Sequence, residues 1–298
     1  MSLQKRSTVR YQRHFLKTWI VNRKLQEKEK GSMKIVDGKI KTKGTLFYEE
    51  ARRKRNGNHV AIARVSDLLK WGVDQEWLAR EYVRINCEVW GCLTESVYIW
   101  TLEKARRHFE TCPEILYCLF LNGKLVGTLT NMFTTEQDLC DKKTWLEKTA
   151  NGTLECHRPN GKLAFGVDLS ITKEAERKGL GTRMVLAALL VTLIGEGKKA
   201  AYLGARIPAY HRQNGMSVDD YVFGVRTNRK PLDPEVYFYM KSGFEIVEII
   251  PGYMEDPQSR DFGVLMKWEN PFYRITEKFP FLKSLVRQIG TRLFLSRI

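Results

Sequence analysis

The chain has 298 residues, 43% hydrophobic content and a formal net charge of +16. This composition is that of a folded protein with a sizeable core and excludes a disordered chain. The longest dense apolar run, residues 185–194, is far shorter than the roughly 20 residues that span a bilayer. The N-terminus is basic but has no apolar segment, so we expect no secretory signal.

Positive charge is concentrated at the two ends of the chain. Residues 1–44 contain 13 Lys and Arg against 3 Asp and Glu, and residues 271–298 contain 6 against 1. The middle of the chain is therefore close to neutral. We predict a basic amphipathic N-terminal extension over residues 1–45, one domain over residues 46–270 and a basic amphipathic C-terminal helix over residues 271–298.

The six cysteines have irregular spacing and include no C-x-x-C pair, and no histidine cluster completes a zinc site. In a chain without a secretory signal, this pattern is typical of reduced thiols in a cytoplasmic protein without a metal centre.

The predicted elements alternate between strands and helices. We expect a basic connector between Gly31 and Gly44, a helix that Ser66 caps, and an irregular excursion with one short helix over residues 133–162. Asn122-Gly123 between two β-rich runs is a strong hairpin signal. The expected strands cover residues 59–64, 115–121, 124–132, 163–171, 200–205, 244–250 and 262–268. The expected helices cover residues 96–109, 182–195 and 234–242.

This order predicts an α/β or α+β domain with a mixed central sheet flanked by helices. A polar stretch, residues 207–233, precedes the helix that is expected over residues 234–242.

A glycine-containing segment, residues 176–182 (ERKGLGT), lies between a predicted strand and the long apolar helix. Gly179 and Gly181 lack Cβ atoms, so the backbone there turns tightly and approaches a ligand closely. The unpaired N–H groups of the helix start attract anions, and Arg177 and Lys178 add positive charge. The segment is neither a Walker A loop nor the G-x-G-x-x-G of a dinucleotide fold, and a tight turn without a ligand is the alternative.

Two motifs together resemble those of the GNAT (GCN5-related N-acetyltransferase) superfamily. The glycine segment resembles its acetyl-CoA-binding motif [QR]-x-x-G-x-[GA], and residues 236–244 (VYFYMKSGF) resemble its F-Y-x-x-x-G-F helix. The resemblance covers residues 58–269. One position departs from the pattern, because Glu176 stands where the motif has Gln or Arg and a carboxylate cannot donate to a phosphate.

Three further blocks, residues 145–160, 204–211 and 243–268, resemble the GNAT domain that is fused N-terminally to nitrilase-type carbon-nitrogen hydrolases. The chain stops near where that second domain would start, so no nitrilase chemistry is expected of it.

The resemblance implies a GNAT fold, in which the fourth and fifth strands splay apart and hold the thioester of acetyl-CoA or another acyl-CoA. It implies that the CoA moiety is held by one run of residues along the fourth strand and another at the helix start. These residues are Leu169, Ser170, Ile171, Arg177, Lys178, Gly179, Leu180, Gly181 and Thr182.

The resemblance also implies that Tyr239 protonates the leaving thiolate, with a core aromatic as the alternative. Some members carry a glutamate early in the fourth strand, but Phe165 stands there. Asp168 is the only acid within this strand and is a candidate base, substrate contact or structural carboxylate. Arg206, at the end of the next strand, is a candidate for binding a substrate carboxylate, and a structural ion pair is the alternative.

We therefore predict an N-acyltransferase that moves an acyl group from CoA to a small-molecule or amino-acid-like amine. A catalytically weak CoA-binding regulator is the alternative, and Glu176 and Phe165 favour it. A third alternative gives the function to the basic tails, through an anionic membrane or, with less support, nucleic acid.

The C-terminal tail repeats apolar residues at helical spacing, which is typical of a helix in the headgroup plane. Packing on the protein body or in a homodimer is the alternative for both tails. We therefore expect a cytoplasmic protein, and peripheral contact with the membrane is the alternative. The apolar stripe of the C-terminal tail consists of Leu282, Leu285, Val286, Ile289 and Leu293.

Overall fold

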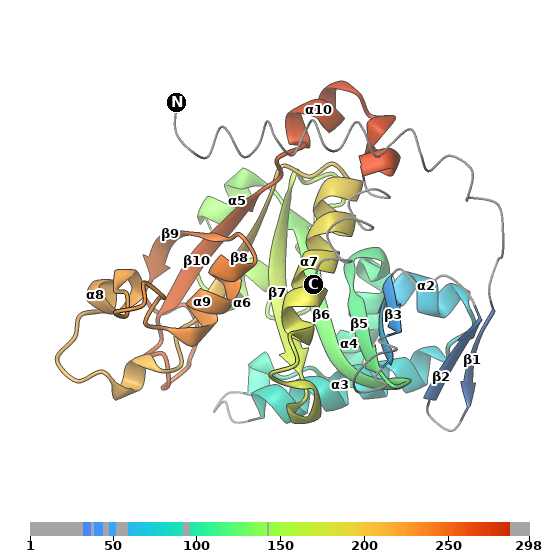
Figure 1. Cartoon of the computed structure of the whole chain (residues 1–298), viewed down its shortest axis with the longest axis horizontal. Helices are drawn as coiled ribbons and strands as arrows, with labels where there is room; N and C mark the ends of the chain where they lie inside the picture. The colour runs from blue at the N-terminus through green and yellow to red at the C-terminus, as the bar shows by residue number, and fades with distance from the viewer. Residues whose placement is uncertain are drawn as a thin grey trace.

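The computed structural model describes residues 32–36, 39–43, 48–51, 59–91, 96–141 and 143–286. Its centre is an eight-stranded sheet with strand order β3-β4-β5-β6-β7-β8-β10-β9 (Figure 1). Neighbouring strands are antiparallel except β7 and β8, which are parallel. The strands are β3 (Tyr48–Ala51), β4 (His59–Arg64), β5 (Tyr117–Leu121), β6 (Lys124–Thr134), β7 (Leu163–Ile171), β8 (Ala200–Arg206), β9 (Glu245–Ile250) and β10 (Gly263–Glu269).

Helices and short 3-10 turns connect and cover these strands. The α-helices are α2 (Val65–Lys70), α3 (Gln75–Trp90), α4 (Leu102–Thr111), α5 (Glu136–Asp141), α6 (Trp145–Thr149), α7 (Leu180–Ala188), α8 (Val218–Phe223), α9 (Pro234–Lys241) and α10 (Tyr273–Lys278). The π-helix Leu189–Gly195 continues α7. The 3-10 turns are Ser96–Tyr98, Pro113–Ile115, Lys173–Ala175 and Tyr210–Arg212.

Strand β5 shows why the sheet has two helical layers. Its residues are all buried, and because successive side chains point to opposite faces they belong to two separate apolar clusters. Cys118 and Phe120 join the cluster that contains Tyr82 of α3, whereas Tyr117 and Leu119 join the cluster that contains Met184 of α7. An unbroken apolar run therefore becomes a central strand covered on both faces.

The hairpin prediction is confirmed. β5 and β6 pair antiparallel, and Asn122 and Gly123 between them have φ values of 54° and 82°. Two positive φ values in succession define the turn that matches the twist of the flanking strands, and Asn-Gly adopts it at low cost. All seven strands expected from residue 59 onward are present.

Three local predictions were wrong, and one further helix was not predicted. Residues expected to form a connector contain an antiparallel pair, β1 (Ser32–Val36) and β2 (Lys39–Lys43). Ser66 does not cap a helix, because α2 begins one residue earlier, after Arg64. The excursion after β6 contains two short helices, α5 and α6, and the polar stretch after β8 contains α8. A capping box between Thr144 and Glu147 fixes the start of α6.

The described part of the C-terminal tail contacts the protein body. Val286 is buried and Leu282 is partly buried against the apolar cluster beneath α7, whereas Phe281 is 76% exposed. Two members of the predicted apolar stripe therefore take part in packing. Residues 1–31 and 287–298 lie outside the described residues, so most of the predicted N-terminal extension and the predicted membrane contact are not located. The three-part domain division stays a prediction.

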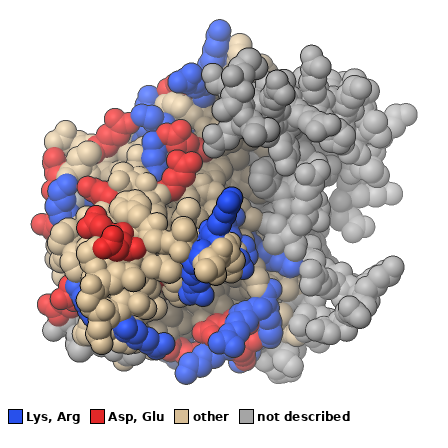
Figure 2. All heavy atoms as spheres, turned by 60° about the vertical axis from the view of Figure 1, so that its left-hand side comes forward, with Lys and Arg blue, Asp and Glu red and all other residues tan. Residues whose placement is uncertain are grey.

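Figure 2 shows the face that includes the left-hand elements of Figure 1, where uncharged surface lies among scattered charges. Large apolar side chains are exposed on α8, α9 and β9 and at the residue after Gly224. These side chains are Phe223, Val225, Met240 and Val247. The homodimer stays a prediction. No helix among the described residues is both long and apolar enough to cross a bilayer.

The connection between β9 and β10 is anchored by one aromatic ring. Tyr253 is 1% exposed, and its ring lies over Gly204 of β8 and Gly263 of β10, where a Cβ atom at either glycine would overlap it. We expect Gly204→Ala to reduce the free energy of unfolding by about 1–3 kcal/mol, as overpacking does.

Urea unfolding of Gly204→Ala, Tyr253→Ala and the double variant measures this contact. Removal of the ring should make the alanine at position 204 nearly neutral. Additive effects of the two substitutions would contradict the described contact.

Candidate active site

The parallel strands β7 and β8 pair only at their beginnings. Their register runs from Leu163 opposite Ala200 to Gly166 opposite Leu203 and then stops. Beyond this point β7 stays paired with β6 and β8 stays paired with β10. Val167 adds an extra residue to β7 between two residues that face adjacent positions of β6. Such a bulge bends a strand. The two strands then diverge, and the edges that face each other across the gap are not paired with one another.

The predicted glycine segment lies beside this gap. Gly179 has φ of 72° and precedes the first residue of α7, and Arg177 also has a positive φ, 57°. A turn this tight explains the glycine at position 179. No side chain caps the first turn of α7, so its N–H groups have no partner within the helix. The start of α7 is therefore an uncapped, positively polarised helix end.

Neighbouring residues leave room at this helix end. A Cβ at Gly179 would meet nothing within 4 Å, and a Cβ at Gly181 would meet the ring of Phe238 of α9 at 3.4 Å. The ammonium of Lys178 donates to the backbone oxygen of Glu174 at 2.6 Å. The lysine thus reinforces the turn.

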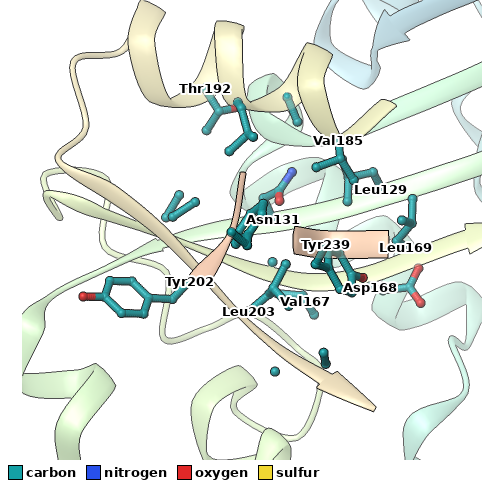
Figure 3. Close-up of a pocket in the computed structure, with 18 of the residues that line it drawn as sticks. Leu129, Asn131, Val167, Asp168, Leu169, Val185, Thr192, Tyr202, Leu203 and Tyr239 are labelled. Atoms are coloured by element: carbon teal, nitrogen blue, oxygen red, sulfur yellow. The ribbon is translucent and has the colours of Figure 1, made fainter. Parts of the chain in front are cut away.

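A pocket of about 100 Å³ occupies the gap and continues beneath α7. In Figure 3, Val185 and Thr192 reach it from the helix above, and Tyr239 lies beside Val167 and Leu169. Its polar lining residues are Asn131, Asp168, Thr192, Tyr202, Arg206, Glu235 and Tyr239, with Trp90 at the same end as Asp168 and Arg206. The pocket joins β6, β7 and β8 to helices from both layers.

Asp168 is buried at this pocket and is held from α3. The Ser170 hydroxyl donates to its carboxylate at 3.0 Å, and the indole N–H of Trp90 in turn donates to the Ser170 oxygen at 2.9 Å. The amide of Asn86 lies 3.5 Å from the same carboxylate. Burial raises the pKa of Asp168 to about 7, and these hydrogen bonds oppose the rise.

Tyr239 lies on α9, whose start is fixed by its sequence. Asp233 accepts from the N–H groups of Glu235 and Val236, and Pro234 occupies the first helical position. The Tyr239 ring is half-buried against Phe238 and Phe244. Burial raises the pKa of Tyr239 above 10, and the charges of Glu235 and Asp168 raise it further, so this phenol stays protonated.

Sequence reasoning missed two residues of this region. Glu235 precedes Tyr239 by one helical turn and lines the same pocket, and burial raises its pKa to about 7 while Arg206 opposes the rise. The i, i+4 spacing was the signal that would have found it. Tyr253 lies over Gly204 with a buried hydroxyl that has no hydrogen-bond partner among the described residues. No local pattern indicates Tyr253, since a loop brings it to β8.

Arg206 is held in a bidentate ion pair. Its guanidinium donates to Asp256 at 2.7 Å and 2.8 Å and lies 5.1 Å from the centre of the Trp90 ring. Asp256 is fully buried, so the pair anchors the β9–β10 connection to β8. The geometry matches the structural alternative, and a substrate contact stays a prediction.

No family model matches the chain. Two curated proteins of Bacillus subtilis (strain 168) are similar to it. The uncharacterized N-acetyltransferase YkwB is 28% identical over 177 residues, which is 59% of this chain and 77% of that protein. The probable hydrolase YhcX is 28% identical over 191 residues, which is 62% of this chain but only 36% of that protein. The chain therefore matches little more than a third of the second relative, and the resemblance to GNAT domains that are fused to nitrilase-type hydrolases stays a prediction.

Solved structures show the same fold. The loading GNATL domain of CurA from Lyngbya majuscula superimposes with a TM-score of 0.58 at 19% identity, over 72% of this chain and 98% of that one. The GNAT-like decarboxylase GphF, in complex with isobutyryl-CoA, gives a TM-score of 0.54 at 21% identity, over 70% and 98%. With the strand order and the divergent parallel pair, these matches confirm the predicted fold. The chain is therefore similar in sequence to an uncharacterized N-acetyltransferase and has the fold of GNAT domains.

The raised pKa of Asp168 makes a prediction about stability. Because this pKa is about 7 in the folded chain against 3.8 for a free carboxyl, ionisation disfavours the fold. The stability of the wild type should therefore fall as pH rises from about 4 to 7, and the penalty should be complete above 7.

Asp168→Asn removes that penalty. We expect it to raise Tm at pH 8 by at least roughly 2–4 °C, with a difference that shrinks toward pH 4. Differential scanning fluorimetry across this range measures it. A pH-independent difference between the two proteins would contradict the assignment.

Proposed function

We propose that this chain binds an acyl-CoA in the gap between β7 and β8 and transfers the acyl group to a small-molecule amine. The observation that carries the proposal is the end of β7–β8 pairing at Gly166 and Leu203, beside the uncapped start of α7. This arrangement offers unpaired strand backbone to an extended ligand and polarised N–H groups to a phosphate. Acetyl-CoA and other acyl-CoA thioesters contain both parts.

Each part of the ligand has proposed partners. The pyrophosphate would contact the N–H groups of residues 177–182, where the space over Gly179 and Gly181 is open on the side away from Phe238. The pantetheine arm would run along Leu169, Ser170 and Ile171, which are paired with β6 but not with β8. Glu176 contributes no donor, so the backbone and Arg177 carry the phosphate contact.

The proposed reaction is direct attack. The neutral amine forms a C–N bond with the thioester carbon, the C–S bond breaks, and the sulfur leaves as a thiolate. Tyr239 gives the thiolate a proton, and the proton that the nitrogen loses when the amide forms restores the Tyr239 phenol. Asp168 accepts the proton that the ammonium form of the acceptor must lose, and Glu235 is a second candidate for this role. A carboxylate whose pKa is about 7 suits a base at neutral pH.

The proposed acceptor is small because the α3 side of the gap is covered. The Tyr98 hydroxyl accepts from the N–H of Glu255 at 3.0 Å, and the N–H of Trp145 donates to the Tyr253 carbonyl at 2.8 Å. These bonds tie the β9–β10 connection to the α3–α4 connection and to α6. A catalytically weak CoA-binding regulator is the second candidate, and the observation in its favour is Glu176.

Acyl-CoA binding is tested at Gly181. The two extra methyl groups of Gly181→Val enter the space at the start of α7, so we expect affinity for acetyl-CoA to fall at least ~10-fold, since displacement of one good phosphate contact costs about that much. Isothermal titration calorimetry measures the affinity.

The matched control is Gly181→Ala. Its single methyl meets Phe238 at an ordinary contact distance, 3.4 Å, and should leave the fold intact. A folded wild type that binds no acyl-CoA would sink the proposed function. Normal binding by Gly181→Val would place the phosphate elsewhere.

Proton donation is tested at Tyr239. Tyr239→Phe keeps the ring contacts but removes the hydroxyl, so we expect kcat to fall on the order of 10²-fold with little change in acyl-CoA affinity. Thiol release with a panel of small amines measures kcat. An unchanged kcat with the best acceptor would remove Tyr239 from the mechanism and would leave CoA binding unaffected.

A further inference from the structure

The part of the pocket that lies beneath α7, here named the branch, is lined by residues that the proposed reaction does not use. It continues from the narrow end of the gap beneath α7, which starts beyond the end of β7 and runs back over the sheet (Figure 1). Figure 3 shows Val185 and Thr192 above this branch. Its walls are formed by Ala164 of β7, Ala188, Leu189 and Leu193 of the helical layer, and Ala201 and Leu203 of β8.

Small side chains leave this space open. Ala164 and Ala201 are directly opposite each other in the paired part of β7 and β8, and Ala188 lines the pocket from α7. Three positions that line the pocket therefore carry only a methyl group. Protein interiors are normally close-packed, and unfilled apolar space lowers stability.

The helix above the branch is irregular at the same place. From Leu189 the chain continues as a π-helix to Gly195, and Leu189, Thr192 and Leu193 of this segment line the pocket. π-Helical turns are rare and occur frequently at functional sites. The cavity and the π-helix coincide.

The branch is suited to an uncharged chain. The Thr192 hydroxyl is already bonded to the Tyr117 hydroxyl at 2.6 Å, and the Asn131 amide donates to the Ile115 carbonyl at 3.0 Å. Arg206 is the only cationic side chain among the residues that line the pocket, and it is paired with Asp256. A terminal carboxylate on the ligand would enter this branch without a partner, at a large cost.

We propose that this branch is an acyl pocket that takes an uncharged acyl chain longer than acetyl, of up to about four carbons. The proposal rests on the proposed function and specifies its acyl donor. The volume sets the upper limit: a cavity of about 150 Å³ holds the six carbons of benzene, so the whole pocket of about 100 Å³, of which the branch is a part, holds no more than about four.

Calorimetric titration of the full chain with acetyl-, butyryl-, decanoyl- and succinyl-CoA tests the proposal. Two buried methylene groups should make butyryl-CoA bind on the order of 10-fold tighter than acetyl-CoA. Decanoyl-CoA should bind no tighter than butyryl-CoA, and succinyl-CoA should bind more weakly. Equal affinity for acetyl and butyryl would overturn the acyl pocket alone, whereas no binding by any thioester would overturn the proposed function with it.

Ala188→Leu tests the location of the pocket, and Ala187→Leu is the matched control. Both residues are buried on α7, but only Ala188 lines the pocket. Ala188→Leu should fill the cavity, reduce the butyryl preference to about two-fold or less and keep acetyl-CoA affinity. Its Tm should equal or exceed that of the wild type, whereas Ala187→Leu should lower Tm through overpacking.

Two outcomes would contradict the location. One is a full butyryl preference in folded Ala188→Leu. The other is a loss of Tm in Ala188→Leu as large as that in Ala187→Leu, because a cavity that is present accommodates the added carbons without strain.

Discussion

The separation of β7 from β8 is the constraint on which the site depends. Each strand is held by its outer neighbour, β6 or β10, for its whole length, but the two strands share only four paired positions. The bulge at Val167 bends β7, and Tyr253 and the Arg206–Asp256 pair fix the end of β8. Unpaired backbone is normally costly inside a sheet. A fold that keeps such a gap open leaves strand edges available to a ligand.

The two sides of the gap have opposite chemical character. On the α3 side, Asp168 is surrounded by donors from Trp90, Asn86 and Ser170, and burial raises its pKa to about 7. Beneath α7, the walls are formed by aliphatic side chains and the hydroxyl of Thr192 is already engaged. One pocket therefore joins a region lined by hydrogen-bonded polar groups to a region that favours hydrocarbon.

Local pattern predicted the parts of this fold that local chemistry determines. The Asn122-Gly123 turn, the buried strand β5 and the turn at Gly179 each follow from residues next to one another in the sequence. Helix α3 was not given bounds by the sequence analysis, although its buried residues Leu78, Tyr82 and Ile85 recur at helical spacing. The role of Tyr253 could not be predicted either, since the glycines that make room for its ring lie on two different strands, β8 and β10. Arg206 was predicted as a site residue, but its partner Asp256 was not, because the β9–β10 connection brings Asp256 to it together with Tyr253.

The β9–β10 connection links stability to the shape of the site. It places the Tyr253 ring over β8, accepts the Trp145 N–H at its carbonyl, and supplies Asp256 to Arg206. A buried tyrosine hydroxyl that has no partner among the described residues lowers stability. Because the Tyr253 ring packs on β8 and Asp256 pairs with Arg206 of β8, the same loop fixes the strand end that diverges from β7.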